Sequence, residues 1–144
     1  MSALDELYRE VILEHYKSPR NRGRLDQPDV ATRGKNPLCG DEIEISLAFD
    51  GDKVRDVRFT GRGCSISQAS ASMLTEAVKG KTIAEAEALV DQFKAAMRGD
   101  VELDDLGDLE ALQGVRRVPA RLKCALLAWT TLEEGLELRK GGLS

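Results

Sequence analysis

Apolar residues recur with helical spacing near the start of this chain. Residues 3–17 carry a stripe with a period of three to four, which predicts an amphipathic helix that ends before Pro19. The expected stripe consists of Leu4, Leu7, Tyr8, Val11, Ile12 and Tyr16. His15, the only histidine of the chain, is expected on the polar side of this helix and exposed to solvent.

The middle of the chain predicts an antiparallel β-hairpin. Residues 43–49 alternate between apolar and polar side chains, residues 50–53 have the composition of a turn, and residues 54–60 form the returning strand. A further short strand is expected near residues 30–33, inside the locally basic, polar segment of residues 17–37.

The second half of the chain is predicted to be helical. Helices are expected over residues 65–79, over residues 82–97, near residues 106–112 and from Pro119 onward. Thr82 and Glu85 have the spacing of a capping box, which marks the start of the second of these helices. The expected core stripe of the last helix is Leu122, Ala125, Leu126, Trp129, Leu132 and Leu136.

Length and composition fit one α+β domain over residues 1–144, with a small antiparallel sheet of about three strands packed against several helices. The net charge of −4 argues against a nucleic-acid partner, and no apolar run approaches a membrane span. The three cysteines are widely spaced, and the N-terminus lacks the apolar core of a signal peptide. We therefore expect a cytoplasmic protein rather than a disulfide framework.

Three cysteines and an aspartate are the candidate metal ligands. Cys39 and Asp41 lie where the hairpin begins and Cys64 lies just after it ends, so all three fall at the same end of the sheet. Cys124 falls in the first or second turn of the last helix and can face the same point. A single cysteine is often only a small core residue. The prediction of a metal site therefore rests on the four residues falling at the same end of the sheet. Three thiolates and a carboxylate complete a tetrahedral zinc site.

Two cations near Cys124 bear on the same site. Three thiolates and a carboxylate leave an excess of negative charge even when a divalent ion is bound, and that excess is costly without cations nearby. Arg121 and Lys123 lie within one helical turn of Cys124 and are the candidates to offset it.

Three segments resemble motifs of the IscU-like iron–sulfur cluster assembly family. They are residues 38–41 (Leu-Cys-Gly-Asp), residues 61–67 (Gly-Arg-Gly-Cys-Ser-Ile-Ser) and residues 118–125 (Val-Pro-Ala-Arg-Leu-Lys-Cys-Ala). The resemblance covers essentially the whole chain, with the motifs in the family's order. It implies the IscU-like α+β fold.

The details resemble the SufU branch of that family rather than IscU proper. Lys123 stands where IscU has a histidine, and residues 118–122 are a poor match to its Leu-Pro-Pro-Val-Lys chaperone-binding motif. The stretch between the last two cysteines is also longer and includes the helix expected over residues 82–97. These departures argue against a scaffold served by an Hsp70 chaperone.

The resemblance implies a zinc-dependent sulfurtransferase. It would accept persulfide sulfur from a class II, pyridoxal-phosphate-dependent cysteine desulfurase and pass it to the Suf-type cluster scaffold complex. By the same resemblance, Zn2+ is held by Cys39, Asp41, Cys64 and Cys124. Cys39 is then the sulfur acceptor, freed from the metal when a desulfurase side chain replaces it, and Arg121 works with the desulfurase.

Two alternatives stay open on the residues alone. The same four positions could hold a transient [2Fe–2S] cluster, which would make the protein an assembly scaffold with visible absorption that a zinc form lacks. Alternatively, zinc could only staple the helices to the hairpin. Substituting Cys39 would then cost stability in step with the other ligands.

Overall fold

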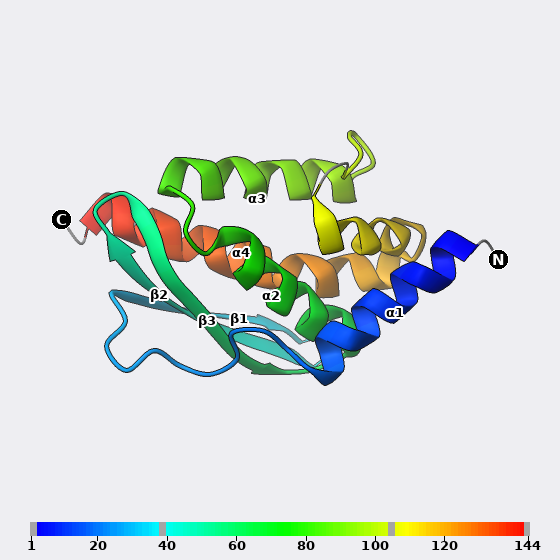
Figure 1. Ribbon diagram of the computed structural model, residues 1–144, viewed down its shortest axis with the longest axis horizontal. Coiled ribbons are helices and arrows are strands. Elements are labelled where there is room, and N and C mark those ends of the chain that lie inside the picture. Colours follow the sequence, from blue (N-terminus) through cyan, green and yellow to red (C-terminus); the bar gives the residue numbers. More distant parts are fainter. Residues whose placement is uncertain (1–2, 38–39, 104–105, 143–144) are drawn as a thin grey trace.

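The computed structural model describes residues 3–37, 40–103 and 106–142. Its elements run in the order α1 (Ala3–Lys17), β1 (Val30–Asn36), β2 (Asp41–Asp50), β3 (Lys53–Arg62), α2 (Ser65–Val78), α3 (Ile83–Met97), η1 (Gly107–Arg117) and α4 (Pro119–Gly142) (Figure 1). η1 is a 3-10 helix and the other four helices are α-helices. Within the described residues, no helix is both long enough and apolar enough to cross a membrane.

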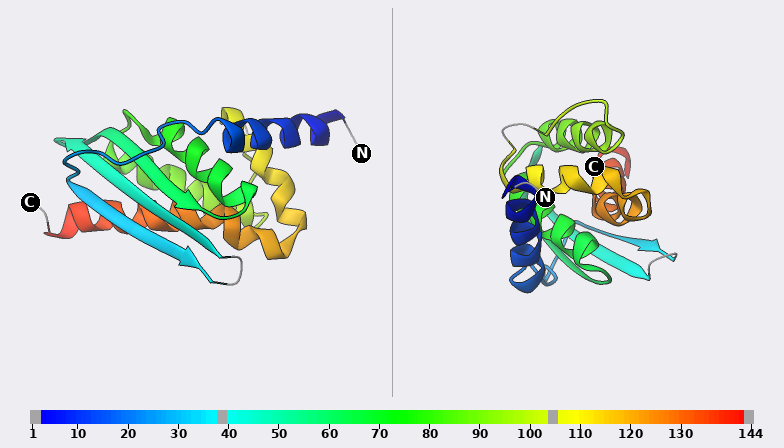
Figure 2. Two further views of the ribbon diagram at one scale, coloured as in Figure 1. Left: turned by 90° about the horizontal axis from the view of Figure 1, so that it is seen from below. Right: turned by 90° about the vertical axis from the view of Figure 1, so that its right-hand side faces the viewer.

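A three-stranded antiparallel sheet forms one layer, in the order β1-β2-β3. Ile45 lies opposite Thr32 on one side and Phe59 on the other. Because side chains alternate along a strand, Ile43, Ile45 and Leu47 share one face, where each is at most 2% exposed. Helices α2 and α4 cover this face (Figure 2). The arrangement confirms the predicted fold class.

Helix α3 packs on α4 on the side away from the sheet (Figure 1). The Thr82 hydroxyl accepts the N–H of Glu85 at 3.1 Å, and the Glu85 carboxylate accepts the N–H of Thr82 at 2.9 Å, so the capping box is confirmed. Phe93 stacks on Trp129 of α4, with ring centroids 4.4 Å apart. The stretch between the last two cysteines therefore contributes to the main core.

Helix α1 packs against α2 and η1 with a face that is rotated from the predicted stripe. Val11 and Ile12 pack against the core as predicted, but Leu7 and Tyr16 are 53% and 45% exposed. His15 is only 1% exposed, so its predicted exposure was wrong. The physical reason is helical spacing, since residue 15 follows residues 11 and 12 by four and three positions and shares their face.

Two elements extend beyond their predicted ends. β1 continues past residue 33 to Asn36, and the short helix expected near residues 106–112 is the longer η1. The extension of β1 matters for the site, because Asn36 reaches a cysteine of the candidate metal centre. Asp108, in the part of η1 that was predicted, reaches His15.

Candidate metal centre

Asp41 is the first residue of β2 and holds a buried carboxylate that is only partly satisfied. Asp41 is only 1% exposed, and its Oδ1 accepts the backbone N–H of Cys64 at 2.9 Å. Oδ2 is buried and has no hydrogen-bond partner among the described residues. A buried carboxylate oxygen without a partner is costly, because it has lost its water. That oxygen is available as a ligand to a cation.

Gly63 lets the end of β3 approach this carboxylate. Its φ is +144°, a conformation that other residues rarely adopt, and a Cβ built there would overlap Asp41 Oδ1. Cys64 follows directly as the N-cap of α2, with extended backbone angles and no side-chain cap hydrogen bond. At this position the positive end of the helix dipole offsets the negative charge of a thiolate ligand.

Cys124 enters the site from α4, in the second turn after Pro119. It is fully buried, and the side-chain amide of Asn36 lies with Nδ2 4.0 Å from its Sγ. Asn36 was not among the predicted site residues. Its position next to Pro37, opposite Asp41 in the register of β1 with β2, is the signal that could have found it. An amide N–H directed at sulfur supports a thiolate there.

One ligand atom from each of Asp41, Cys64 and Cys124 lies within 4.8 Å of the others. Ligand atoms of tetrahedral zinc are about 3–4 Å apart, so these three atoms lie close enough together to fill three of its four positions. Two sulfurs and one carboxylate oxygen are a donor set that zinc accepts, and Asp41, whose Oδ2 has no hydrogen-bond partner among the described residues, supplies the oxygen. Three of the predicted ligands therefore come together and fit zinc. Cys39 lies outside the described residues, and its part in the site stays a prediction.

Arg121 lies beside both described thiols. The pKa of Arg121 is raised above its ordinary value, first by its hydrogen bond to Cys124 and then by its electrostatic interaction with Cys64 and Cys124. Its side chain is otherwise exposed, so solvent screens this effect. The structure thus places one of the two predicted cations against the sulfur atoms. Lys123 is exposed on the same turn of α4.

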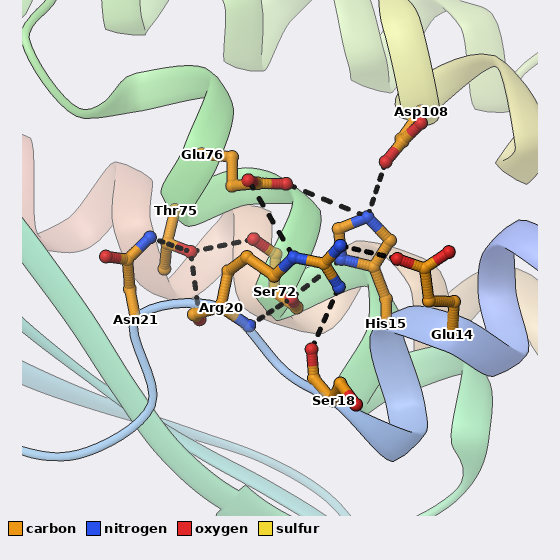
Figure 3. Close-up of polar contacts among 9 residues, drawn as sticks. All are labelled: Glu14, His15, Ser18, Arg20, Asn21, Ser72, Thr75, Glu76 and Asp108. Carbon is orange, nitrogen blue, oxygen red and sulfur yellow. Dashed lines mark hydrogen bonds and ion pairs between the residues drawn. The ribbon is translucent and has the colours of Figure 1, made fainter.

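A second polar cluster joins α1, α2 and η1 (Figure 3). His15 Nδ1 lies 2.7 Å from Ser72 Oγ, and His15 Nε2 lies 2.7 Å from Asp108 Oδ2. The backbone N–H of Arg20 donates to Ser72 Oγ at 2.8 Å, and the Arg20 guanidinium pairs with Glu76 at 3.9 Å. The cluster connects residues that are far apart in sequence.

His15, Glu76 and Asp108 also satisfy the geometric condition for a metal group, with one ligand atom each within 4.8 Å. Both ring nitrogens of His15 are already hydrogen-bonded, however, and Glu76 contacts Arg20 as well as His15. Both carboxylates are about half exposed. We therefore interpret this cluster as a structural tie between three helices, unlike the Asp41 site.

The fold and the thiol–carboxylate site define a protein of the iron–sulfur assembly class. The chain belongs to the family of NifU-like N-terminal domains, whose family model matches residues 7–138. A solved NifU-like N-terminal domain from Brucella abortus superposes with a TM-score of 0.88, at 24% identity, over 98% of this chain and 99% of that one. This likeness shows the shared fold.

Two relatives are much more similar in sequence. The chain is 52% identical over 141 residues to the zinc-dependent sulfurtransferase SufU of Bacillus subtilis, covering 96% of this chain and 95% of that protein. It is 43% identical over 139 residues to the iron–sulfur cluster assembly scaffold protein IscU of Streptococcus pyogenes, covering 95% of this chain and 87% of that protein. These similarities confirm the family that the sequence motifs predicted.

Proposed function

We propose that this protein is a zinc-dependent sulfurtransferase of iron–sulfur cluster assembly. The observation that carries the proposal is the 52% identity to SufU along nearly the full length of both chains. The site supports it, since Asp41, Cys64 and Cys124 supply three donors suited to zinc. Neither Cys64 nor Cys124 forms a disulfide with a described residue, which suits activity in the reducing cytoplasm.

The residues of the site have distinct roles in this proposal. When bound, zinc holds the site's cysteines as thiolates and protects them from oxidation. Asp41 supplies the one oxygen ligand, and Gly63 and the Cys64 N–H fix the position of its carboxylate. Arg121 stabilises negative charge where the thiolates meet the surface.

Cys39 is the proposed sulfur acceptor, and a class II cysteine desulfurase is the proposed donor. The Cys39 thiolate attacks the outer sulfur of the persulfide on the desulfurase cysteine. A new sulfur–sulfur bond forms on Cys39 while the old one breaks, and the desulfurase cysteine leaves as a thiolate. The exchange conserves electrons and needs no oxidant. We propose a Suf-type cluster scaffold complex as the recipient of this sulfur.

The test is alanine release from cysteine by a class II desulfurase, in the presence of a reductant, with and without the zinc-loaded protein. Strong acceleration that is lost in Cys39→Ala supports sulfur transfer. In Asp41→Ala, acceleration should fall and recover in part with excess zinc, because the carboxylate acts as a ligand. No acceleration by the natural protein would overturn the proposal.

A cluster scaffold is the second candidate function. The similarity to the Streptococcus pyogenes scaffold IscU favours it, and a thiolate-rich site with one carboxylate could hold a labile [2Fe–2S] cluster. Purification under anaerobic conditions separates the two candidates. A colourless protein with one zinc ion per chain supports the sulfurtransferase, whereas visible absorption with bound iron and sulfide supports the scaffold.

A further inference from the structure

A basic groove lies on the outer face of the sheet, the face that α2 and α4 leave uncovered. Its hollow measures about 330 Å³ and is lined by residues of all three strands and of the segment before β1. The rim consists of four cations, 64–82% exposed: Arg24, Arg33, Lys35 and Arg62. Two glutamates beneath them, Glu42 and Glu44, are 34% and 14% exposed.

The register of the strands builds this groove. Glu42 on β2 lies between Lys35 on β1 and Arg62 on β3, and Glu44 lies opposite Arg33. Arg62 Nε contacts Glu42 at 2.5 Å and Arg33 Nε contacts Glu44 at 2.7 Å. Such cross-strand pairs stabilise the sheet weakly, because they are exposed to solvent. The four cations outnumber the two carboxylates, so the groove is positive on a chain whose net charge is −4.

The groove adjoins the metal centre. Glu42 follows the ligand Asp41 on β2, and Arg62 ends β3 two positions before Cys64. A partner that covers the groove therefore reaches the end of the sheet where the thiols lie. Charge of one sign next to a reactive site is an arrangement that steers a charged partner.

We propose that this groove docks an acidic surface of the protein that delivers persulfide sulfur to the metal centre. The inference rests on the proposed function and adds a partner surface to it. The contacts of Arg33 and Arg62 to the glutamates use Nε, and a guanidinium has four further N–H donors for carboxylates of a partner. The cations are spread along the rim and largely exposed, which suits a broad protein surface better than a small anion.

Two double variants separate docking from a purely structural role. Arg33→Gln/Arg62→Gln and Glu42→Gln/Glu44→Gln both remove the Arg33–Glu44 and Arg62–Glu42 ion pairs, and the glutamate variant also removes the pairs with Arg24 and Lys35. The first variant lowers the positive charge of the groove and the second raises it. The measurement is alanine release by the class II desulfurase over a titration of each zinc-loaded protein. The fit gives kcat and the KM for this protein, at several salt concentrations.

Docking predicts opposite shifts. The arginine variant should raise the KM about tenfold and flatten its dependence on salt, and the glutamate variant should lower the KM, with kcat unchanged in both. Shifts in the same direction, or no shift, would overturn the inference. If the natural protein accelerates alanine release while both variants keep its KM, docking at the groove is contradicted and the proposed function is not. If the natural protein gives no acceleration, both the docking inference and the proposed function are contradicted.

A third variant controls for net charge. Arg98→Gln/Lys140→Gln removes two exposed cations from ion pairs on the helical side of the molecule. It has the same net charge as the arginine variant of the groove. Its KM should match that of the natural protein at every salt concentration. A tenfold rise in this variant as well would assign the effect to overall charge and overturn the docking surface.

Discussion

Two polar clusters lie along α2, and they differ in how well their buried groups are satisfied. At the start of the helix, Cys64 meets Asp41, whose buried Oδ2 has no partner among the described residues. Two turns later, Ser72 meets His15, and both nitrogens of that buried ring are hydrogen-bonded. Among the described residues, the first cluster leaves one buried oxygen without a partner, whereas the second satisfies both ring nitrogens. The contrast separates a site that binds from a contact that stabilises.

Cys124→Ser should have the largest effect on this contrast. Serine oxygen is a much poorer zinc ligand than thiolate, so zinc affinity should fall by at least about 100-fold, as measured by competition with a chromophoric chelator. Removing zinc from the natural protein with a strong chelator should lower its unfolding temperature. The same treatment should change the Cys124→Ser protein little. Unchanged zinc affinity in the variant would contradict the assignment of this cluster as the metal centre.

His15→Ala should give the reverse result. It removes a buried ring and leaves Ser72 and Asp108 without their partner, so the free energy of unfolding should fall by about 2–4 kcal/mol. Zinc content should stay at one ion per chain. Urea unfolding of the zinc-loaded proteins measures the loss.

Tyr16→Ala is the matched control for this variant, because it is on the same helix and 45% exposed. Its stability should change by less than about 1 kcal/mol. Loss of zinc from His15→Ala at full stability would mean that the His15 cluster holds the metal, and the contrast between the two clusters would be lost.

Gly63→Ala should affect both stability and zinc. The glycine has a φ of +144° and its Cβ position overlaps Asp41, so we expect a loss of about 1–3 kcal/mol together with weaker zinc binding. Gly80→Ala is the control, because Gly80 has a φ of +88° with open space around it. It should cost about 1 kcal/mol and leave zinc binding unchanged. If both changes have the same effect on stability and on zinc binding, Gly63 serves only to allow a positive φ and its close approach to Asp41 has no role.

Asn36→Ala should have the smallest effect. It removes the amide that approaches Cys124 Sγ, so the zinc affinity should fall about tenfold while the fold is kept. Asn36→Asp is a sharper version, because it places a second carboxylate beside a thiolate and should weaken zinc further. An Asn36→Asp protein that binds zinc as well as the natural one would argue against a thiolate at Cys124.

The hairpin explains why much of the metal centre could be predicted from sequence. Strand alternation and the turn at residues 50–53 place Asp41 and Cys64 at one end of the sheet, whatever the rest of the fold. Cys124 could be added because Pro119 marks the start of α4. In these cases local rules of strand and helix geometry fix the positions.

Partners across long sequence separations could not be predicted in this way. The contact of His15 with Asp108 spans 93 positions, and no local pattern pairs them. The burial of His15 itself could have been predicted, because the residue lies on the same helical face as Val11 and Ile12. Its polarity had favoured the opposite interpretation. Asn36 was missed because the strand was expected to end at residue 33.

The decisive measurement is the site of persulfide formation. The zinc-loaded protein is incubated with the class II desulfurase and cysteine, the thiols are alkylated, and the peptides are analysed by mass spectrometry. We expect one additional sulfur atom on the peptide that contains Cys39, and unmodified sulfur on the peptides of Cys64 and Cys124. Persulfide on Cys64 or Cys124, or none on any cysteine, would contradict sulfur transfer through Cys39.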